Sequence, residues 1–151
     1  MLGFSPKMCA SLLGVGDQTF RYWRENLFPF KNKKRFTSPE LFTFRLFLFF
    51  IRRKGVTVCN LKKLQIKNMF LHIANNTCAE LQQQIIYIDF TDNTFSFQYT
   101  PDPKVDIYSL DIYYLHLRHV VEEHFLWYEC YGTKRKQWTV FFRLAFVVTT
   151  I

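Results

Sequence analysis

The sequence holds few cysteines and spaces them widely. Cys9, Cys59, Cys78 and Cys130 form no CxxC pair, and no two of them are close together. A small domain held by disulfides or by a structural zinc ion needs grouped cysteines, so this spacing argues against both. We therefore expect buried or half-buried thiols in a reducing compartment.

Long apolar runs are also lacking. The two most apolar stretches, residues 41–51 and 139–151, each contain an arginine and are shorter than the ~20 apolar residues of a membrane-spanning helix. The opening residues, MLGFSPKM, show no basic start followed by an apolar run, so we expect no signal peptide. Both stretches are interpreted as core elements of a soluble, cytoplasmic protein without a membrane partner.

Catalytic motifs are lacking as well. There is no glycine-rich phosphate loop, no GxSxG and no close Cys–His arrangement, and the acid pair Asp89 and Asp92 lies where turn chemistry explains it. His116 and His119 are three residues apart in HLRHVVEEH (116–124), which fits neither HExxH nor HxxEH. A plain polar helix face is favoured over a metal site. We expect no enzyme, no cofactor and no metal.

Acidic residues are scarce in the first half only. Residues 1–67 hold fourteen Lys and Arg against three acids, a net charge of +11, whereas residues 68–151 hold six against nine, a net charge of −3; the two sum to +8. Eighteen Phe and eight Tyr exclude a disordered chain. The split predicts a basic domain over 1–67 that meets a polyanion and a second domain over 68–151 with another task.

The basic half begins with two predicted helices. Ser5-Pro6 is a capped helix start, Gly14 is a helix end, and helical spacing resumes at Asp17 after the short GVG link. Helix, short glycine turn and helix form the helix-turn-helix pattern, whose second helix enters the major groove of DNA. Its first turn offers Asp17, Gln18 and Thr19 to the base edges.

The second helix mixes aromatic and basic residues. Phe20 and Trp23 lie three apart and are predicted to face the core, while Arg21 and Arg24 share another face and Tyr22 lies at the edge. This mixture fits a helix that buries one face and lays the other along a DNA backbone. An amphipathic surface helix with incidental arginines is the alternative.

The segment 27–40 carries a run of cations, Lys31, Lys33, Lys34 and Arg35, between Phe30 and Phe36. Its position after the helix-turn-helix predicts a wing that grips phosphates; a solvated charge run is the alternative. Ser38-Pro39 is read as the capped start of a long apolar helix that ends at Gly55. Thr57 then caps a further helix, expected over about 57–73.

These elements resemble the DNA-binding domain of the MerR family of transcriptional regulators. The resemblance covers about residues 4–67 and rests on ASLLGVGDQTFRYWREN, RFTSPE and FIRRKGVTVCNLKKL, with Arg21-Tyr22-Trp23 matching the family's Arg-Tyr-aromatic triplet. It implies a winged helix-turn-helix that binds inverted repeats in promoters as a dimer. Arg21, Tyr22 and Arg35 would contact phosphates, and Gln18 and Thr19 would read bases.

The chain departs from that family in several ways. The wing is short and lacks glycines, Lys34 stands where an aromatic often precedes the wing arginine, and Gly16 replaces the usual Ser or Thr cap. No long coiled-coil helix follows. As a short MerR-like chain without a sensor domain, it also resembles a small group of cyanobacterial regulators. These regulators are encoded beside CRISPR-associated transposons and repress the effector gene.

The second half is predicted to be a small antiparallel sheet with a helix, which makes the whole chain α+β. Residues 84–100 alternate as a hairpin with its turn at Asp92-Asn93. Residues 109–124 fit a helix better than a strand, and residues 125–148 are read as a hairpin that turns at 132–136. A dimerisation module is favoured over an aromatic drug pocket or a redox switch at Cys130.

The sequence therefore predicts a dimeric, sequence-specific regulator of double-stranded DNA. Repression is favoured because no sensor and no small-molecule effector site is visible. An architectural or excisionase-like protein of a mobile element is the alternative, and an RNA-binding or protein-interaction module is a third. Stacking of single-stranded bases on Tyr22 and Trp23 would indicate the third class, whereas the helix spacing predicts a buried Trp23.

Overall fold

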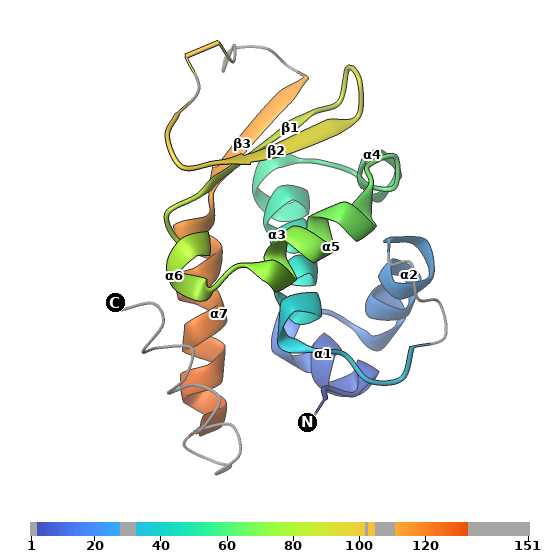
Figure 1. Ribbon diagram of the computed structural model, residues 1–151. Helices are drawn as coiled ribbons and strands as arrows, with labels where there is room; N and C mark the ends of the chain where they lie inside the picture. The colour runs from blue at the N-terminus through green and yellow to red at the C-terminus, as the bar shows by residue number, and fades with distance from the viewer. Residues whose placement is uncertain (1–2, 28–32, 102, 105–110, 133–151) are drawn as a thin grey trace. The chain divides into compact units, whose positions relative to one another are not determined.

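The computed structural model describes residues 3–27, 33–101, 103–104 and 111–132. Within these residues the chain is α+β, with seven helices and a three-stranded antiparallel sheet (Figure 1). It divides into two compact units, Met1–Ala74 and Asn75–Ile151. The boundary expected at residue 67 falls inside helix α5 (Ile66–Asn75).

The first two helices begin and end as their local sequence predicts. In α1 (Pro6–Leu13) the Ser5 hydroxyl accepts the Met8 N–H at 3.2 Å, and Gly14 ends the helix with a φ of +70°. Residues 14–16 then lead into α2 (Asp17–Leu27), which packs against α1. Ser5 supplies the cap that an exposed helix start needs, and Gly14 adopts the left-handed conformation that other residues avoid.

Helix α3 (Ser38–Lys54) is capped by Thr37, so the expected cap at Ser38 is wrong. The Thr37 hydroxyl accepts the Glu40 N–H at 3.4 Å, and the Glu40 carboxylate accepts the Thr37 N–H at 3.0 Å. A reciprocal capping box needs Glu three residues after the cap, and this spacing selects Thr37. The predicted end at Gly55 is confirmed by its φ of +69°.

Helix α3 is the buried element of the first unit. All of its residues from Glu40 to Phe50 are buried, as expected for a helix that is apolar nearly all round. Phe44 packs against Phe20 of α2 and Phe36, with ring centroids 5.0 and 5.9 Å away, and Phe20 and Phe36 lie edge to face at 5.4 Å. Each such pair contributes roughly 0.5–1.5 kcal/mol beyond its buried area, so this cluster fixes α2 on α3.

The single helix expected over 57–73 is wrong, because two helices occupy this segment. Thr57 caps α4 (Val58–Leu61) as predicted, a turn follows, and α5 begins at Ile66. Leu64 and Ile66 are both buried. In one continuous helix they would point about 200° apart, and the intervening turn lets both face inward.

The second unit contains α6 (Cys78–Leu81), β1 (Ile85–Asp89), β2 (Thr94–Gln98), β3 (Ile112–His116) and α7 (Leu117–Gly132). The strand order is β2-β1-β3, and both pairings are antiparallel. Ile86 is opposite Phe97 and Leu115, and both Ile86 and Ile88 are completely buried. The predicted hairpin is confirmed, with Asn93 at a φ of +58° in its turn.

The helix expected over 109–124 is wrong in its first part, where β3 forms, and right from Leu117, where α7 begins. The strand expected from residue 125 is also wrong, since α7 continues to Gly132. IYYLH (112–116) is rich in residues with high strand propensity, and pairing with the buried β1 outweighs its helical spacing. The rest of the hairpin expected after Gly132 lies outside the described residues. Over the described parts of the chain, no helix has both the length and the apolar character to cross a membrane.

Candidate nucleic-acid interface

Helix α2 has one buried face and one exposed face. Phe20, Trp23 and Leu27 are 1%, 4% and 2% exposed, which confirms the predicted burial of Trp23. Five of the exposed residues lie in its first half, and all five were predicted to contact DNA: Asp17, Gln18, Thr19, Arg21 and Tyr22. Of the side chains predicted to meet DNA from this helix, these five are accessible together, whereas Arg24 is half-buried.

Two arginines of α3 hold the end of α1 and the turn that leads to α2. Arg45 is completely buried, and its Nη2 donates to the Leu12 carbonyl at 3.2 Å; Arg52 Nη2 donates to the Gly14 carbonyl at 3.3 Å. Carbonyls at a helix end lack partners within the helix, and these guanidinium groups supply them. Both arginines belong to the basic excess counted from the sequence, yet their hydrogen bonds serve the fold.

The expected wing is held at its end by the segment before α1. Phe4 and Phe36 form an antiparallel bridge in which each N–H donates to the other carbonyl at 2.8 Å. A side chain at Gly3 would meet Arg35 Cβ at 3.0 Å, so the backbones approach closely here. Lys34 and Arg35 are exposed, and Lys31 lies outside the described residues. Arg35 therefore projects from a backbone position fixed by pairing.

Lys33 differs from its neighbours. Its ammonium lies 2.7 Å from Glu40 Oε1, and the Glu40 side chain is completely buried. The same carboxylate oxygen accepts the Thr37 hydroxyl at 2.9 Å. Lys33 therefore neutralises a buried carboxylate at the start of α3, a role that the sequence pattern did not indicate.

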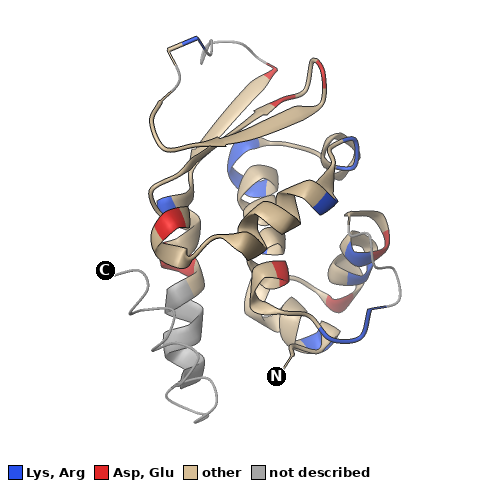
Figure 2. Cartoon of the chain, viewed as in Figure 1, with Lys and Arg blue, Asp and Glu red and all other residues tan. Residues whose placement is uncertain are grey.

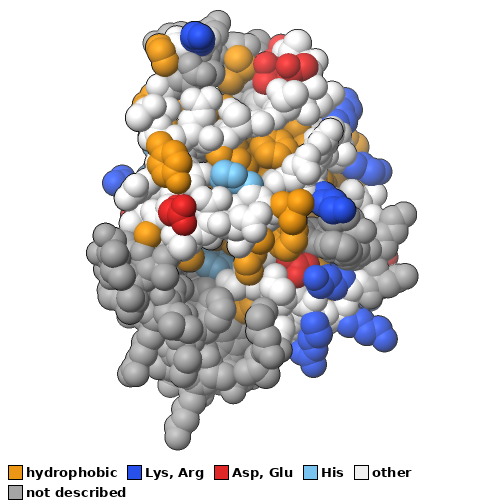
Figure 3. Space-filling view, in the orientation of Figure 1, with side chains coloured by type: hydrophobic (Ala, Val, Ile, Leu, Met, Phe, Trp, Pro, Cys, Tyr) orange, Lys and Arg blue, Asp and Glu red, His pale blue; other side chains and the backbone are white. Residues whose placement is uncertain are grey.

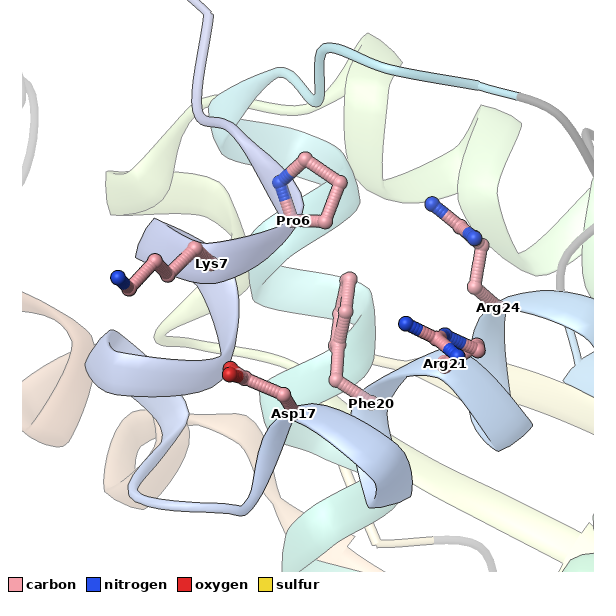
Figure 4. Close-up of a pocket in the computed structure, with 6 residues that line it drawn as sticks. All are labelled: Pro6, Lys7, Asp17, Phe20, Arg21 and Arg24. Carbon is pink, nitrogen blue, oxygen red and sulfur yellow. The ribbon is translucent and has the colours of Figure 1, made fainter.

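A pocket of about 320 Å³ lies between α1 and α2 (Figure 4). It is lined by Pro6, Lys7, Asp17, Phe20, Arg21 and Arg24. Arg24 Nε is buried and has no hydrogen-bond partner within the described part of the chain. The sequence pattern indicated Arg21 and Arg24 but not Lys7, although the Ser5-Pro6 start places Lys7 in the first turn of α1.

The second unit offers weaker candidates. His116 ends β3 and His119 lies in α7, so the helix predicted over 109–124 does not carry both histidines. No group of three or more His, Cys, Asp or Glu residues suited to a metal ion occurs within the described segments. A smaller pocket of about 190 Å³ lies on the sheet, lined by Tyr87, Ile88, Asp89, Thr94, Phe95, Ser96, Gln98 and Ile112.

Burial controls the chemistry of two thiols. Burial, aided by the negative charge of Glu40, raises the pKa of the Cys9 thiol to about 12. Burial likewise raises the pKa of the Cys78 thiol to about 11. Thiolates are the reactive form of cysteine, so neither group is a ready nucleophile near neutral pH. Cys59 is exposed, whereas the side chain of Cys130 lies outside the described residues.

The charges separate by unit. Residues 68–74 carry no charged side chain, so the sums of +11 and −3 apply to the two units as well. In Figure 2 the Lys and Arg positions lie mainly on the helices of the first unit, and several of these side chains stand out from the surface in Figure 3. Comparisons of the chain with family models, curated proteins and solved structures found no match.

Proposed function

We propose that this chain is a DNA-binding transcriptional regulator that inserts α2 into the major groove. The observation that carries the proposal is the division of α2 into a buried aromatic face and an exposed polar and basic face. A helix held by Phe20 and Trp23 on one side presents Gln18, Thr19 and Arg21 on the other. The short turn from α1 to α2 is the connection that helix-turn-helix proteins use.

The residues of the proposed DNA surface have two roles. Gln18 and Thr19, with Asp17 beside them, hydrogen-bond to base edges and supply sequence preference. Phosphates are neutralised by four cations, which supply affinity: Arg21, Arg24, Lys34 and Arg35. The Tyr22 hydroxyl donates a further hydrogen bond to a phosphate. Lys33 is left out of this set because Glu40 occupies its ammonium. In this proposal the segment from Lys33 to Thr37 is the end of a MerR-like wing.

Duplex DNA suits this surface better than a single strand does. Single-strand binders stack bases on accessible aromatic rings, and Trp23 is only 4% exposed. Tyr22, at 49% exposed, is the one large aromatic side chain of α2 that is open to solvent. A surface dominated by cations and short polar side chains is typical of groove and backbone recognition.

The proposed regulator acts as a homodimer and a repressor. Helix-turn-helix proteins read two half-sites about 34 Å apart, which requires a second copy of the recognition helix. We assign dimerisation to the second unit, whose sheet has β2 and β3 as outer strands among the described residues. An architectural, excisionase-like protein is the alternative, and it differs in having little sequence preference.

The test is a binding comparison. Fluorescence anisotropy would measure the affinity of the full chain for the duplex upstream of its own coding sequence and for a random duplex of equal length, across a salt series. A regulator binds its own region more tightly at physiological salt, with two chains per site. Equal affinity for both duplexes would reject the regulator and favour the architectural alternative.

Two substitutions separate the proposed roles. Arg35→Gln should weaken binding to all duplexes alike and flatten the plot of log K against log salt by about 0.9 per bound chain. Gln18→Ala should reduce the preference for the specific duplex and leave that slope unchanged. Lys67→Gln is the matched control, since it removes one exposed charge from α5 of the same unit. Identical behaviour of the three variants would contradict the assignment.

A further inference from the structure

The pocket between α1 and α2 has an excess of positive charge. Three of its lining residues are cations, Lys7, Arg21 and Arg24, and one is an acid, Asp17. None of the three cations forms an ion pair or a side-chain hydrogen bond with another residue that the structure describes. Lys33 differs from them because its ammonium pairs with Glu40, and Arg45 differs because its Nη2 donates to the Leu12 carbonyl.

Arg24 carries the most specific sign of a ligand. Its Nε–H is buried, and no acceptor for it exists within the described residues. Buried donors are nearly always paired, because a donor withdrawn from water without an acceptor is costly. An oxygen of a bound anion is the acceptor that a guanidinium group prefers, since its donors match carboxylate and phosphate geometry.

The geometry leaves room for an anion beside Arg24. Figure 4 shows the guanidinium groups of Arg21 and Arg24 on one side of the Phe20 ring, with Pro6 and the first turn of α1 across from them. The ammonium of Lys7 extends away from the arginines. The Lys7 backbone N–H belongs to the first turn of α1, where such groups lack intrahelical partners. The pocket volume of about 320 Å³ is roughly ten times that of a liquid water molecule.

We propose that this pocket binds one phosphate group, held chiefly by Arg21 and Arg24 and supported by the N-terminal turn of α1. Where the phosphate belongs to a DNA backbone, the inference rests on the proposed function and adds α1 to the DNA contacts. A small phosphorylated compound offers the same chemistry and is the other source. Asp17 opposes the anion at the other end of the pocket and limits its affinity.

The first experiment uses inorganic phosphate as the probe. The full chain would be titrated by NMR at constant ionic strength, with chloride replacing phosphate in the reference. Arg24→Gln should weaken phosphate binding about tenfold, because a charged hydrogen-bonding partner is lost. Asp17→Asn should strengthen it, because a repulsive charge is removed. Lys67→Gln, which removes one exposed charge from α5 outside the pocket, should leave it unchanged.

The second experiment uses a random DNA duplex and charge-conserving variants. Arg24→Lys keeps the charge but loses the buried Nε–H, so it should weaken duplex binding several-fold with an unchanged salt slope. Arg118→Lys is the matched control at an exposed position of α7, outside the proposed DNA surface, and should bind as the natural chain does. An effect of Arg24→Lys on the duplex assigns the phosphate to DNA, whereas effects on inorganic phosphate alone assign it to a free compound.

The two proposals fail separately. If the chain binds no duplex at all, the proposed function is lost, and the titration with inorganic phosphate still decides the pocket. The pocket proposal is overturned if Arg24→Gln and Asp17→Asn bind inorganic phosphate as the natural chain does and Arg24→Lys binds duplex as Arg118→Lys does. Asp17 is exposed, so its variant remains informative even if changes at Arg24 impair folding.

Discussion

At the scale of single residues, Glu40 joins the loop before α3 to the start of that helix. Its completely buried carboxylate accepts the N–H and the hydroxyl of Thr37 and pairs with Lys33. Glu40→Gln removes the charge that these donors match and leaves Lys33 without its partner. We expect the free energy of unfolding to fall by about 1.5–3 kcal/mol, measured by urea denaturation.

Glu80→Gln is the matched control for that substitution. Glu80 accepts the N–H of Thr77 in a second capping box at the start of α6, where the hydrogen bonds are exposed to solvent. Its loss should lower the free energy of unfolding by roughly 0.5 kcal/mol. Equal effects of the two substitutions would mean that burial and the Lys33 pairing add nothing at Glu40.

Cys9 predicts a pH dependence of stability. Its thiol has a pKa of about 12 in the folded chain, against an ordinary value of 9.0, because burial and the charge of Glu40 disfavour the thiolate. Above pH 9 the unfolded chain releases this proton and the folded chain retains it, so stability falls as pH rises from about 9 to 12. The limiting slope is about 1.4 kcal/mol per pH unit.

The contribution of Cys9 is measured by difference. Urea denaturation across that pH range should show a flatter decline for Cys9→Ala than for the natural chain. Cys59→Ala removes an exposed thiol and should follow the natural chain. If all three proteins decline in parallel, the Cys9 thiol titrates normally in the folded state.

At the scale of elements, the turn between α1 and α2 contains two glycines with different tasks. Gly14 has a φ of +70°, whereas Gly16 has no positive φ and precedes α2; a Cβ would meet no atom within 4 Å at either position. Gly14→Ser should lower the free energy of unfolding by about 1–2 kcal/mol, because a side chain disfavours the left-handed conformation. Thermal unfolding monitored by circular dichroism would measure it.

The same substitution two residues later should act in the opposite direction. Gly16→Ser introduces a better N-cap for α2 and should raise the free energy of unfolding by a few tenths of a kcal/mol. Because both variants add the same side chain in open space, their difference isolates the backbone conformation. A shift of the same sign for both would contradict this account of the turn.

At the scale of the whole molecule, the number of chains bound to DNA is readable from salt dependence. Arg21, Arg24, Lys34 and Arg35 give four phosphate contacts per chain in the proposed complex. The slope of log K against log salt should then be about −3.6 for one bound chain and about −7 for two. Anisotropy across a salt series measures the slope, and sedimentation of the complex counts the chains.

The second unit supplies the control for this measurement. Arg118 is exposed and lies near Glu122 on α7, with the two charged groups 3.7 Å apart. Arg118→Gln changes the net charge as much as any change in the first unit, yet it should leave the slope unaltered. A slope that depends only on net charge would show that the first unit has no defined interface.

The sequence by itself determined the features that local interactions decide. Helix starts are set locally at Ser5-Pro6 and Thr57, and a helix end is set locally at Gly14, because each cap bonds to backbone only a few residues away. Asp92-Asn93 forms the turn of a hairpin between adjacent strands. The spacing of Phe20 and Trp23 was enough to predict their burial, because a helix repeats its faces at a known interval.

Only the tertiary structure decided which charged residues serve the fold. Arg45 donates to a carbonyl 33 residues earlier in the chain, and Arg52 donates to one 38 residues earlier. No pattern in the neighbouring sequence indicates either hydrogen bond. Pairing with the buried β1 likewise made a strand of IYYLH (112–116), where helical spacing favoured a helix. The pocket that joins Lys7 to Arg21 and Arg24 exists only because α1 packs on α2. Contacts between distant segments depend on how the helices and strands pack. That packing cannot be recognised from local patterns in a single sequence.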